Sequence, residues 1–227
     1  MSLVALIGSP VAHSLSPRMQ NAAFAARGLD WTYVACDVDR EDVEAALKGL
    51  EALGFAGANV TAPHKVEVAR LVEADLPSVN TLLFDPLRAV STDTAILDGL
   101  ELERPAIIGD GGAAKAFRHR LPKAEVYSRR GEWPPSAKGY DLVVNATPVQ
   151  DEVLLRLGPG QTLVDLPYPE SATAAAAREA GARVFGGLEV LVAQGAASFE
   201  LWTGVPAPVE VMRRAVGLAD APPDVSG

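Results

Sequence analysis

Residues 57–65 read Gly57-Ala58-Asn59-Val60-Thr61-Ala62-Pro63-His64-Lys65, a pattern that predicts a short strand, a turn and the start of a helix. Pro63 biases the residue before it towards extended backbone and is compatible with a helix that begins just beyond it. Asn59, Thr61 and Lys65 then lie where the strand ends and the helix begins, which is where α/β proteins place ligand-binding groups. The stretch alone fits equally well an ordinary strand–turn–helix with a surface lysine.

The composition restricts the class of protein around this stretch. The chain has 227 residues, of which 48% are hydrophobic and 22% charged, so it can form a core as one large domain or two compact ones. A net charge of −9 argues against a nucleic-acid or anionic-membrane partner. The first residues lack the features of a signal peptide, and no apolar run has the length of a membrane span. Cys36 is the only cysteine, which excludes an intrachain disulfide and favours a cytoplasmic protein.

Strands and helices alternate through the first half of the chain. We expect strands at 3–7, 31–36 and 57–61 and helices at 16–27, 40–53 and 64–72, followed by a strand pair at 80–84 and 87–91. Ser16 is predicted to cap the first helix, with Pro17 at its first position, and Thr92-Asp93 to open a further helix. Strands that alternate with helices indicate a mostly parallel sheet covered on both faces, which is the α/β class.

A second run of the same kind begins at residue 105. The expected strands are 105–108, 125–128, 142–145, 162–166 and 183–185, with helices at 113–121 and 170–180. Helices at 188–203 and 209–218 close the chain, and segment 219–227 is expected to be a frayed tail. The sequence therefore predicts an α/β protein made of two such runs.

A glycine-rich turn lies between the first strand and the first helix of the second run. It reads Gly109-Asp110-Gly111-Gly112-Ala113, and glycines let a backbone approach a pyrophosphate, which the helix N-terminus then binds. Gly109, Gly111, Gly112 and Ala113 are therefore candidate dinucleotide-binding residues, although a plain tight turn has the same composition. Asp110 opposes this interpretation, because a carboxylate near phosphates weakens binding unless it points to solvent.

The end of the following strand indicates which dinucleotide would bind. An acidic residue there holds the ribose hydroxyls of NAD, whereas arginine accommodates the 2′-phosphate of NADP. The chain has Ser128-Arg129-Arg130 at this place and no acid, which favours NADP. A solvated basic turn is the alternative interpretation.

Polar residues elsewhere in the chain suggest a second pocket, for a small acid. Ser14 and Ser16 are two positions apart, so in an extended loop both hydroxyls would face one carboxylate. The other candidate donors, acceptors and charged groups are Asn59, Thr61, Asn80, Gln194, Lys65 and Asp93. Such a set suits a polyhydroxylated acid better than an apolar ligand, although each of these residues taken singly is more often an exposed polar side chain than a ligand contact.

Several longer motifs follow one another from Val4 to about Gly217. They are His13-Ser14-Leu15-Ser16-Pro17, Asn59-Val60-Thr61-Ala62-Pro63 with Lys65, Val79-Asn80-Thr81, Thr92-Asp93, the glycine-rich turn, Asn145-Ala146-Thr147, and Gln194-Gly195 with Trp202-Thr203-Gly204. In this order they resemble the shikimate dehydrogenase family. The serine pair, the Asn-Val-Thr-Ala-Pro run and the closing motif are specific to that family rather than to nucleotide-binding folds in general.

The resemblance implies a reaction and a role for each candidate residue. The reaction would be the reversible reduction of 3-dehydroshikimate to shikimate by NADPH, with Lys65 and Asp93 as the catalytic pair. Lys65 would act either as the base or chiefly as the group that orients and polarises the oxygen. Ser14, Ser16 and Tyr168 would hold the carboxylate of shikimate. The ring hydroxyls would be bound by Thr61, Asn80, Asp93 and Gln194, with Asn59 beside them.

The resemblance also implies two domains with the active site between them. The substrate domain would comprise residues 1–92 and 188–227, and a trimmed Rossmann-like NADP-binding domain residues 93–187. In binding NADP(H), Thr147, Gly187 and Val190 would join the glycine-rich turn and Ser128-Arg129-Arg130. The expected partner is the small-molecule substrate, and the expected assembly is a monomer or homodimer.

The nucleotide half departs from the family pattern. Only about 17 residues separate Ser128 from Asn145, which is short for a helix, a strand and their connections. Pro77-Ser78 stands where the family has Gly-Ala, and Asp110 replaces a small residue. Two alternatives therefore stay open: a dehydrogenase for quinate or another hydroxy acid, and a shikimate-binding protein with impaired cofactor binding.

Metal chemistry is not expected from this sequence. His13, His64 and His119 are scattered and the single cysteine has no neighbour of its kind, so the spacing of a metal site is missing. His64 is expected on the surface at the start of a helix.

Overall fold

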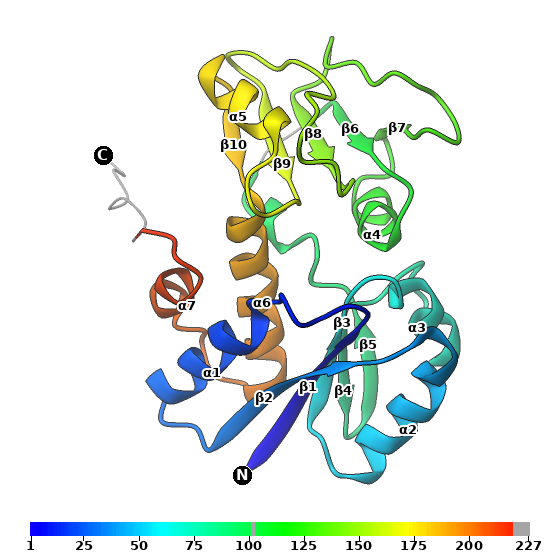
Figure 1. Cartoon of the computed structure of the whole chain (residues 1–227), viewed down its shortest axis with the longest axis vertical. Coiled ribbons are helices and arrows are strands. Elements are labelled where there is room, and N and C mark those ends of the chain that lie inside the picture. Colours follow the sequence, from blue (N-terminus) through cyan, green and yellow to red (C-terminus); the bar gives the residue numbers. More distant parts are fainter. Residues whose placement is uncertain (101–102, 220–227) are drawn as a thin grey trace.

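Two five-stranded sheets form the framework of the chain in the computed structural model, which describes residues 1–100 and 103–219. The strand order is β2-β1-β3-β4-β5 in the first sheet and β10-β9-β8-β6-β7 in the second. Figure 1 shows the sheets in separate halves, with the long helix α6 (Gly187–Thr203) reaching from one half to the other. The predicted α/β class is confirmed.

Four strands of the first sheet run in the same direction. β1 (Ser2–Gly8) pairs in parallel with β2 (Trp31–Asp37) and with β3 (Gly57–Val60). β4 (Thr81–Phe84) is antiparallel to β3, and β5 (Leu87–Val90) is antiparallel to β4. The prediction of a mostly parallel sheet therefore holds, with β4 as the reversed strand.

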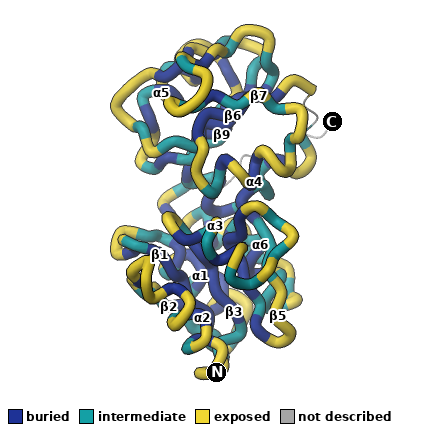
Figure 2. The backbone as a smooth tube through the Cα atoms, turned by 90° about the vertical axis from the view of Figure 1, so that its right-hand side faces the viewer, coloured by how far each residue is buried: buried dark blue, intermediate teal, exposed yellow. Residues whose placement is uncertain are grey.

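Helices cover both faces of this sheet, so β1 is apolar from Leu3 to Ile7. Successive side chains of a strand point to opposite faces. Ala5 and Ile7 belong to the core formed with α2 (Val43–Ala52) and α3 (Lys65–Leu71). Val4 and Leu6 belong to the core formed with α1 (Ser16–Ala26), α6 and α7 (Val209–Ala215). Figure 2 shows β1 and β3, which are buried for most of their length, inside the lower half.

The glycine that begins β3 is required by a close contact with α6. The indole nitrogen of Trp202 donates a hydrogen bond to the carbonyl of Leu82 at 2.9 Å, directly beside Gly57. A Cβ at position 57 would lie 2.4 Å from that nitrogen, so a side chain there would displace the ring. The closing motif around Trp202 is thereby hydrogen-bonded to the strand that contains Leu82 and packed against β3, the strand that leads to Lys65.

All five strands of the second sheet are parallel. They are β6 (Pro105–Ile108), β7 (Glu125–Tyr127), β8 (Leu142–Asn145), β9 (Thr162–Asp165) and β10 (Arg183–Phe185). α4 (Gly112–Arg120) connects β6 to β7, and the chain then crosses to the other side of β6 to form β8. Such a reversal of strand order creates a crevice at the carboxyl ends of the strands, where ligands bind.

Two crossover connections of this sheet are made without helices. The structure describes every residue of 128–141 and 146–161, and neither segment contains a helix. Instead, Trp133, Tyr140, Leu154 and Leu155 from these segments cover one face of the sheet together with α5 (Ala172–Glu179). The expected trimming of the nucleotide half therefore corresponds to irregular segments in place of crossover helices, from which a few apolar side chains cover the sheet.

Three local predictions are wrong. Ser16 is the first residue of α1 and not its cap, since Leu15 already has helical backbone angles (φ −85°, ψ −8°) and the Ser14 hydroxyl accepts a hydrogen bond from the Ser16 N–H at 3.2 Å. Thr92-Asp93 leads only to a single 3₁₀ turn, η2 (Ala95–Leu97), because Asp98 returns to extended backbone. His64 is fully buried and its Nε2 lies 2.7 Å from the carbonyl oxygen of Val38, which ties the start of α3 to the chain after β2.

Other expectations differ only at their boundaries. The helix predicted at 40–53 is a 3₁₀ turn, η1 (Arg40–Asp42), followed by α2. Most of the predicted tail, residues 220–227, lies outside the described residues. Among the residues that the structure describes, none of the helices combines the length and apolar character needed to cross a membrane. The same residues contain no group of three or more His, Cys, Asp or Glu that could hold a metal ion.

Candidate active site

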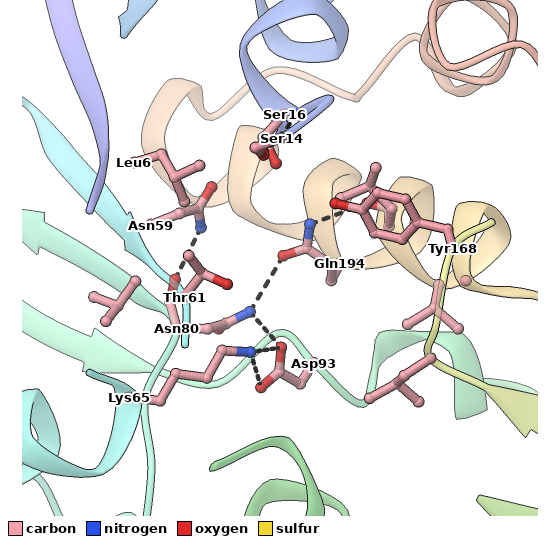
Figure 3. A pocket seen from close by; sticks show the side chains of 15 residues that line it. Leu6, Ser14, Ser16, Asn59, Thr61, Lys65, Asn80, Asp93, Tyr168 and Gln194 are labelled. Carbon is pink, nitrogen blue, oxygen red and sulfur yellow. Dashed lines mark hydrogen bonds and ion pairs between the residues drawn. The ribbon is translucent and has the colours of Figure 1, made fainter. Parts of the chain in front are cut away.

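A cavity of about 190 Å³ lies where the two halves meet. Its walls come from the carboxyl ends of β1 and β3, the start of α3, the loop after β9 and the first turns of α6. The residues predicted to bind substrate or to carry the reaction all line it: Ser14, Ser16, Asn59, Thr61, Lys65, Asn80, Asp93, Tyr168 and Gln194. Figure 3 shows the serine pair at one end of the cavity and Lys65 with Asp93 at the other.

Lys65 and Asp93 form a largely buried ion pair. The Lys65 ammonium lies 2.7 and 2.8 Å from the two carboxylate oxygens of Asp93, and the side chains are 14% and 9% exposed. Lys65 stands at the first position of α3, just after the turn that the sequence Ala62-Pro63 predicts, while Asp93 follows β5. Hydrogen bonds between two charged groups at such distances are strong, so each side chain fixes the other.

Asn80 connects this pair to α6. Its side-chain oxygen accepts the Thr92 N–H at 2.7 Å, and its side-chain nitrogen lies 3.0 Å from Asp93 Oδ1 and 3.2 Å from Gln194 Oε1. The Gln194 amide in turn donates to the Leu191 carbonyl at 3.0 Å. Because Asn80 is only 2% exposed, its main effect is to hold the Asp93 carboxylate and the Gln194 amide at fixed positions on the cavity wall.

Asn59 lines the cavity, but its polar atoms are used within the protein. Its oxygen accepts from the Tyr33 hydroxyl at 2.8 Å, and its nitrogen donates to the Asn80 carbonyl at 2.9 Å and to Ser198 Oγ at 3.1 Å. The sequence reasoning missed Tyr33 and Ser198. Ser198 follows Gln194 by four positions, so the helical spacing placed both on one face of α6 and was a usable signal.

Three hydroxyl groups gather at the other end of the cavity. Ser14 and Ser16 both face it although the loop is not extended, since Leu15 between them is helical. Tyr168 comes from the loop after β9 in the other half of the molecule. Burial raises the pKa of the Tyr168 phenol, and its hydrogen bond with Ser14 acts in the opposite direction. Three neutral O–H donors from two halves form a suitable site for a carboxylate.

A second cavity, of about 250 Å³, lies in the nucleotide half. The predicted residues that line it are Gly109, Ser128, Arg129, Arg130 and Thr147. Sequence reasoning did not propose Trp133, Pro148 and Val149, which also line it and come from the segments that replace the crossover helices. No spacing rule pointed to these three, because their position depends on how an irregular segment folds back onto the sheet.

Both predicted guanidinium groups lie near carboxylates in this cavity. Arg129 is 3.3 Å from Glu152 and stacks over the Trp133 ring at 5.5 Å, and Arg130 is 3.4 Å from Asp110. The Asp110 side chain is 50% exposed, so its charge is partly solvated as well as paired. The acid of the glycine-rich turn is therefore present at the cavity but is balanced by the arginine beside it.

The glycine-rich turn has the shape that a pyrophosphate requires. Gly109 has a φ of +124°, and a Cβ there would lie 3.0 Å from the Ala146 carbonyl oxygen, so this position excludes side chains. Gly111 precedes the first turn of α4, and a Cβ on it would meet no described atom within 4 Å, which leaves room for a ligand. Gly112 and Ala113 then begin the helix. The open N-terminal turn and the arginine-lined cavity together fit a phosphorylated dinucleotide.

Gly187 and Val190 line the first cavity rather than the second. A Cβ on Gly187 would lie 2.3 Å from the Pro167 carbonyl oxygen, so the start of α6 packs directly onto the loop that carries Tyr168. The two residues predicted to bind the cofactor therefore lie on a wall of the first cavity to which both halves contribute.

Comparison with known proteins agrees with this geometry. The family model of the shikimate dehydrogenase substrate binding domain matches residues 6–82, and that of the shikimate 5′-dehydrogenase C-terminal domain matches residues 187–216. The shikimate dehydrogenase (NADP(+)) of Moorella thermoacetica is 39% identical over 93% of this chain and 91% of that protein. That of Methanocella arvoryzae is 36% identical over 94% of this chain and 97% of that protein.

The chain belongs to the shikimate dehydrogenase family. Among solved structures, the shikimate 5-dehydrogenase of Thermus thermophilus in complex with NADP(H) and shikimate superimposes with a TM-score of 0.81 and 29% identity. That superposition covers 95% of this chain and 98% of that one. The predicted family is thus confirmed over nearly the whole chain.

This member of the shikimate dehydrogenase family is shorter than its relative from Moorella thermoacetica. The alignment of the two extends over 269 positions, whereas this chain has 227 residues, so the relative has segments that this chain lacks. In this chain the connections 128–141 and 146–161 contain no helix.

The buried carboxylate of Asp165 connects residues that line the two cavities of this shikimate dehydrogenase family member. Asp165, at the end of β9, accepts a hydrogen bond from the Asn145 amide at 2.7 Å, and Asn145 Oδ1 accepts from the Thr147 hydroxyl at 2.7 Å. Thr147 lines the nucleotide cavity, while the loop after Asp165 carries Tyr168 into the substrate cavity. Burial raises the pKa of the Asp165 carboxyl, and the hydrogen bond from Asn145 opposes that effect.

Proposed function

We propose that the protein is a shikimate dehydrogenase, which reversibly reduces 3-dehydroshikimate to shikimate with NADPH. The observation that carries this proposal is the Lys65–Asp93 ion pair, with distances of 2.7 and 2.8 Å, in a hydroxyl-lined cavity at the junction of the two halves. A positively charged hydrogen-bond donor at such a junction serves a reaction between a bound polyhydroxy acid and a dinucleotide held by the opposite half.

The substrate would lie with its carboxylate at the serine pair. Ser14, Ser16 and Tyr168 supply three neutral hydroxyl donors for that carboxylate. Thr61, Asn80, Asp93 and Gln194 lie along the remaining wall and would bind the ring hydroxyls. Asn59, whose polar atoms are used within the protein, contributes by holding Asn80 and the wall in place.

The nucleotide half would hold NADP(H) through its open helix start and its arginines. Bound NADP(H) supplies or accepts the hydride. We assign the 2′-phosphate to Arg129 and Arg130, with Ser128 and Thr147 beside them, because planar guanidinium groups match phosphate oxygens. The pyrophosphate is assigned to Gly109, Gly111, Gly112 and Ala113, and the nicotinamide end to Gly187 and Val190 at the shared wall.

Lys65 would supply the proton that the reduction needs. When the ketone carbon receives a hydride, its oxygen must receive a proton. An ammonium has three N–H donors, and Lys65 uses two of them on Asp93, so one is left for the substrate oxygen. In the reverse direction the neutral amine accepts the hydroxyl proton, and Asp93 stabilises the ammonium that forms. Lys65 thus acts as acid or base and orients the oxygen at the same time.

We further assign residues 1–92 and 188–227 to the substrate domain and residues 93–187 to the NADP-binding domain. The separate strand sets of the two sheets support this division. A cytoplasmic location and a monomeric or homodimeric assembly stay predictions.

Steady-state kinetics with shikimate and quinate test the substrate assignment. We expect the catalytic efficiency with NADP⁺ to be higher for shikimate than for quinate. A clear preference for quinate would overturn the choice of substrate but not of reaction. Shikimate binding without NADP⁺ or NAD⁺ binding, measured by calorimetric titration, would instead indicate a binding protein.

A further inference from the structure

The loop before β4 makes a buried contact with the cofactor helix of the other half. Ser78 is 0% exposed, and its hydroxyl donates a hydrogen bond to the carbonyl oxygen of Gly112 at 2.7 Å. Gly112 is the first residue of α4, in the turn that is assigned to the pyrophosphate. A single side chain of the substrate half therefore fixes the start of the cofactor helix.

The same contact includes Lys65. The N–H of Val79, the residue after Ser78, donates to the Lys65 carbonyl oxygen at 3.1 Å. A Cβ on Gly112 would lie 2.9 Å from the Lys65 Cβ and 3.4 Å from its Cδ, so the start of α4 packs directly against the stem of that lysine. Figures 1 and 2 both show α3 and α4 next to each other where the two halves meet.

We propose that Ser78 is a positioning residue, whose hydroxyl holds the cofactor-binding turn of α4 against Lys65. This inference rests on the proposed dehydrogenase function. Ser78 is not among the described residues that line either cavity, so it acts through Gly112 and Lys65 and not on a ligand. The hydrogen bond sets the distance between Lys65, which donates or accepts the proton, and the first turn of α4, which binds the dinucleotide.

Hydride transfer is sensitive to such a distance. Reacting atoms must approach to about 3–3.5 Å, and a displacement of about 1 Å costs roughly a hundredfold in rate. Without the Ser78 hydroxyl, α4 and α3 would separate more readily, and productive contact would be reached in a smaller fraction of complexes. Binding of either ligand alone does not require that contact, because the groups for shikimate and for the dinucleotide mostly lie on opposite halves.

Replacing Ser78 by alanine tests the proposal in the full chain. We expect kcat for shikimate oxidation to fall about two- to tenfold, which is the ratio that corresponds to the free energy of one neutral hydrogen bond. The dissociation constants of shikimate alone and of NADPH alone, measured by calorimetry, should each change less than about twofold. This is the size of change expected when the substituted residue does not itself contact the ligand. Ser78→Cys, which keeps the shape of the side chain with a somewhat larger atom and donates weakly, should lie between wild type and alanine.

Thr203→Val is the matched control. The hydroxyl of the half-buried Thr203 donates to the Phe199 carbonyl oxygen at 2.8 Å and accepts the Val205 N–H at 3.1 Å at the end of α6, so its loss removes hydrogen bonds that involve none of the described residues lining the two cavities. Its kcat should stay at the wild-type value. Gly112→Ala, which forces a Cβ against Lys65, should reproduce the kcat loss of Ser78→Ala.

Two results would overturn the positioning role: a wild-type kcat in Ser78→Ala, or equal kcat losses in Ser78→Ala and Thr203→Val. A Ser78→Ala protein that fails to fold leaves Ser78→Cys as the deciding variant. If the wild-type protein itself does not oxidise shikimate with NADP⁺, the proposed function fails. An active wild type with unaffected junction variants refutes only the role of Ser78.

Discussion

Replacing Lys65 by methionine is the substitution that most directly perturbs the proposed chemistry. Methionine keeps most of the aliphatic stem, which packs against Gly112, and removes the ammonium. Asp93 would lose bonds of 2.7 and 2.8 Å and keep the Asn80 amide at 3.0 Å. We expect kcat to fall by about 10²–10⁴, the usual contribution of a general acid or base. The KM for shikimate should change less than about threefold, because the carboxylate-binding hydroxyls are untouched.

The same substitution has a predictable cost in stability. Removing one partner of a buried ion pair costs about 3–5 kcal/mol, because the other charge stays buried without compensation. Lys65 and Asp93 are 14% and 9% exposed, so solvent reduces the expected cost to about 2–3 kcal/mol. Adding Asp93→Asn should recover part of this free energy of unfolding without restoring kcat, since it removes the unpaired carboxylate.

The assays are NADPH absorbance for the kinetics and urea denaturation for the stability. Lys48→Met is the matched control, because Lys48 pairs with Glu44 at 2.7 Å but both side chains are more than half exposed. It should change neither kcat nor stability measurably. A Lys65→Met enzyme with more than about a tenth of the wild-type kcat, well above the range for a lost acid or base, would refute the assigned role.

Four further substitutions test other parts of the structure. Gly57→Ala should lower the free energy of unfolding by about 1–3 kcal/mol by overpacking, since its Cβ would lie 2.4 Å from the indole nitrogen of α6. Gly49→Ala in α2, where a Cβ meets no described atom within 4 Å, should instead raise it by about 0.5–1 kcal/mol; equal effects in urea denaturation would contradict the packing argument. Asp110→Asn should tighten NADP⁺ binding about two- to fivefold in calorimetric titration at low salt, because a carboxylate beside the phosphate site is removed. Weaker binding would show that Asp110 helps by orienting Arg130. Burial raises the pKa of Asp165 above its ordinary value of 3.8, so the folded protein keeps this proton to higher pH than the unfolded chain, and the stability due to the neutral form is lost as pH rises through that window. Asp165→Asn should therefore become more stable relative to wild type between about pH 4 and pH 7, and an unchanged difference in urea denaturation would show that the carboxyl titrates normally.

Local sequence patterns predicted most of the framework. Apolar runs, glycine stops and the turn after Thr61 placed nearly all strands and helices within a few residues, because each of these signals acts on its own neighbours. The motifs, together with the family resemblance that named Tyr168, likewise identified the polar residues that line the first cavity.

What could not be predicted depends on contacts between distant segments. Asn59 was expected to face a ligand, but its polar atoms bond to Tyr33, Asn80 and Ser198, which lie elsewhere in the sequence. His64 was expected at the surface, but the chain after β2 covers it. Trp133 enters the nucleotide cavity from a helix-free segment, whose path no periodicity describes.

The nucleotide half decides whether this short member of the shikimate dehydrogenase family is an enzyme. The most direct measurement is the formation of NADPH by the purified full chain supplied with shikimate and NADP⁺. The ion pair of Lys65 and the arginine-lined cavity predict that NADPH forms only when shikimate and NADP⁺ are both present, and that NADP⁺ is reduced faster than NAD⁺. Shikimate binding without any reduction of NADP⁺ or NAD⁺ would contradict the proposed function.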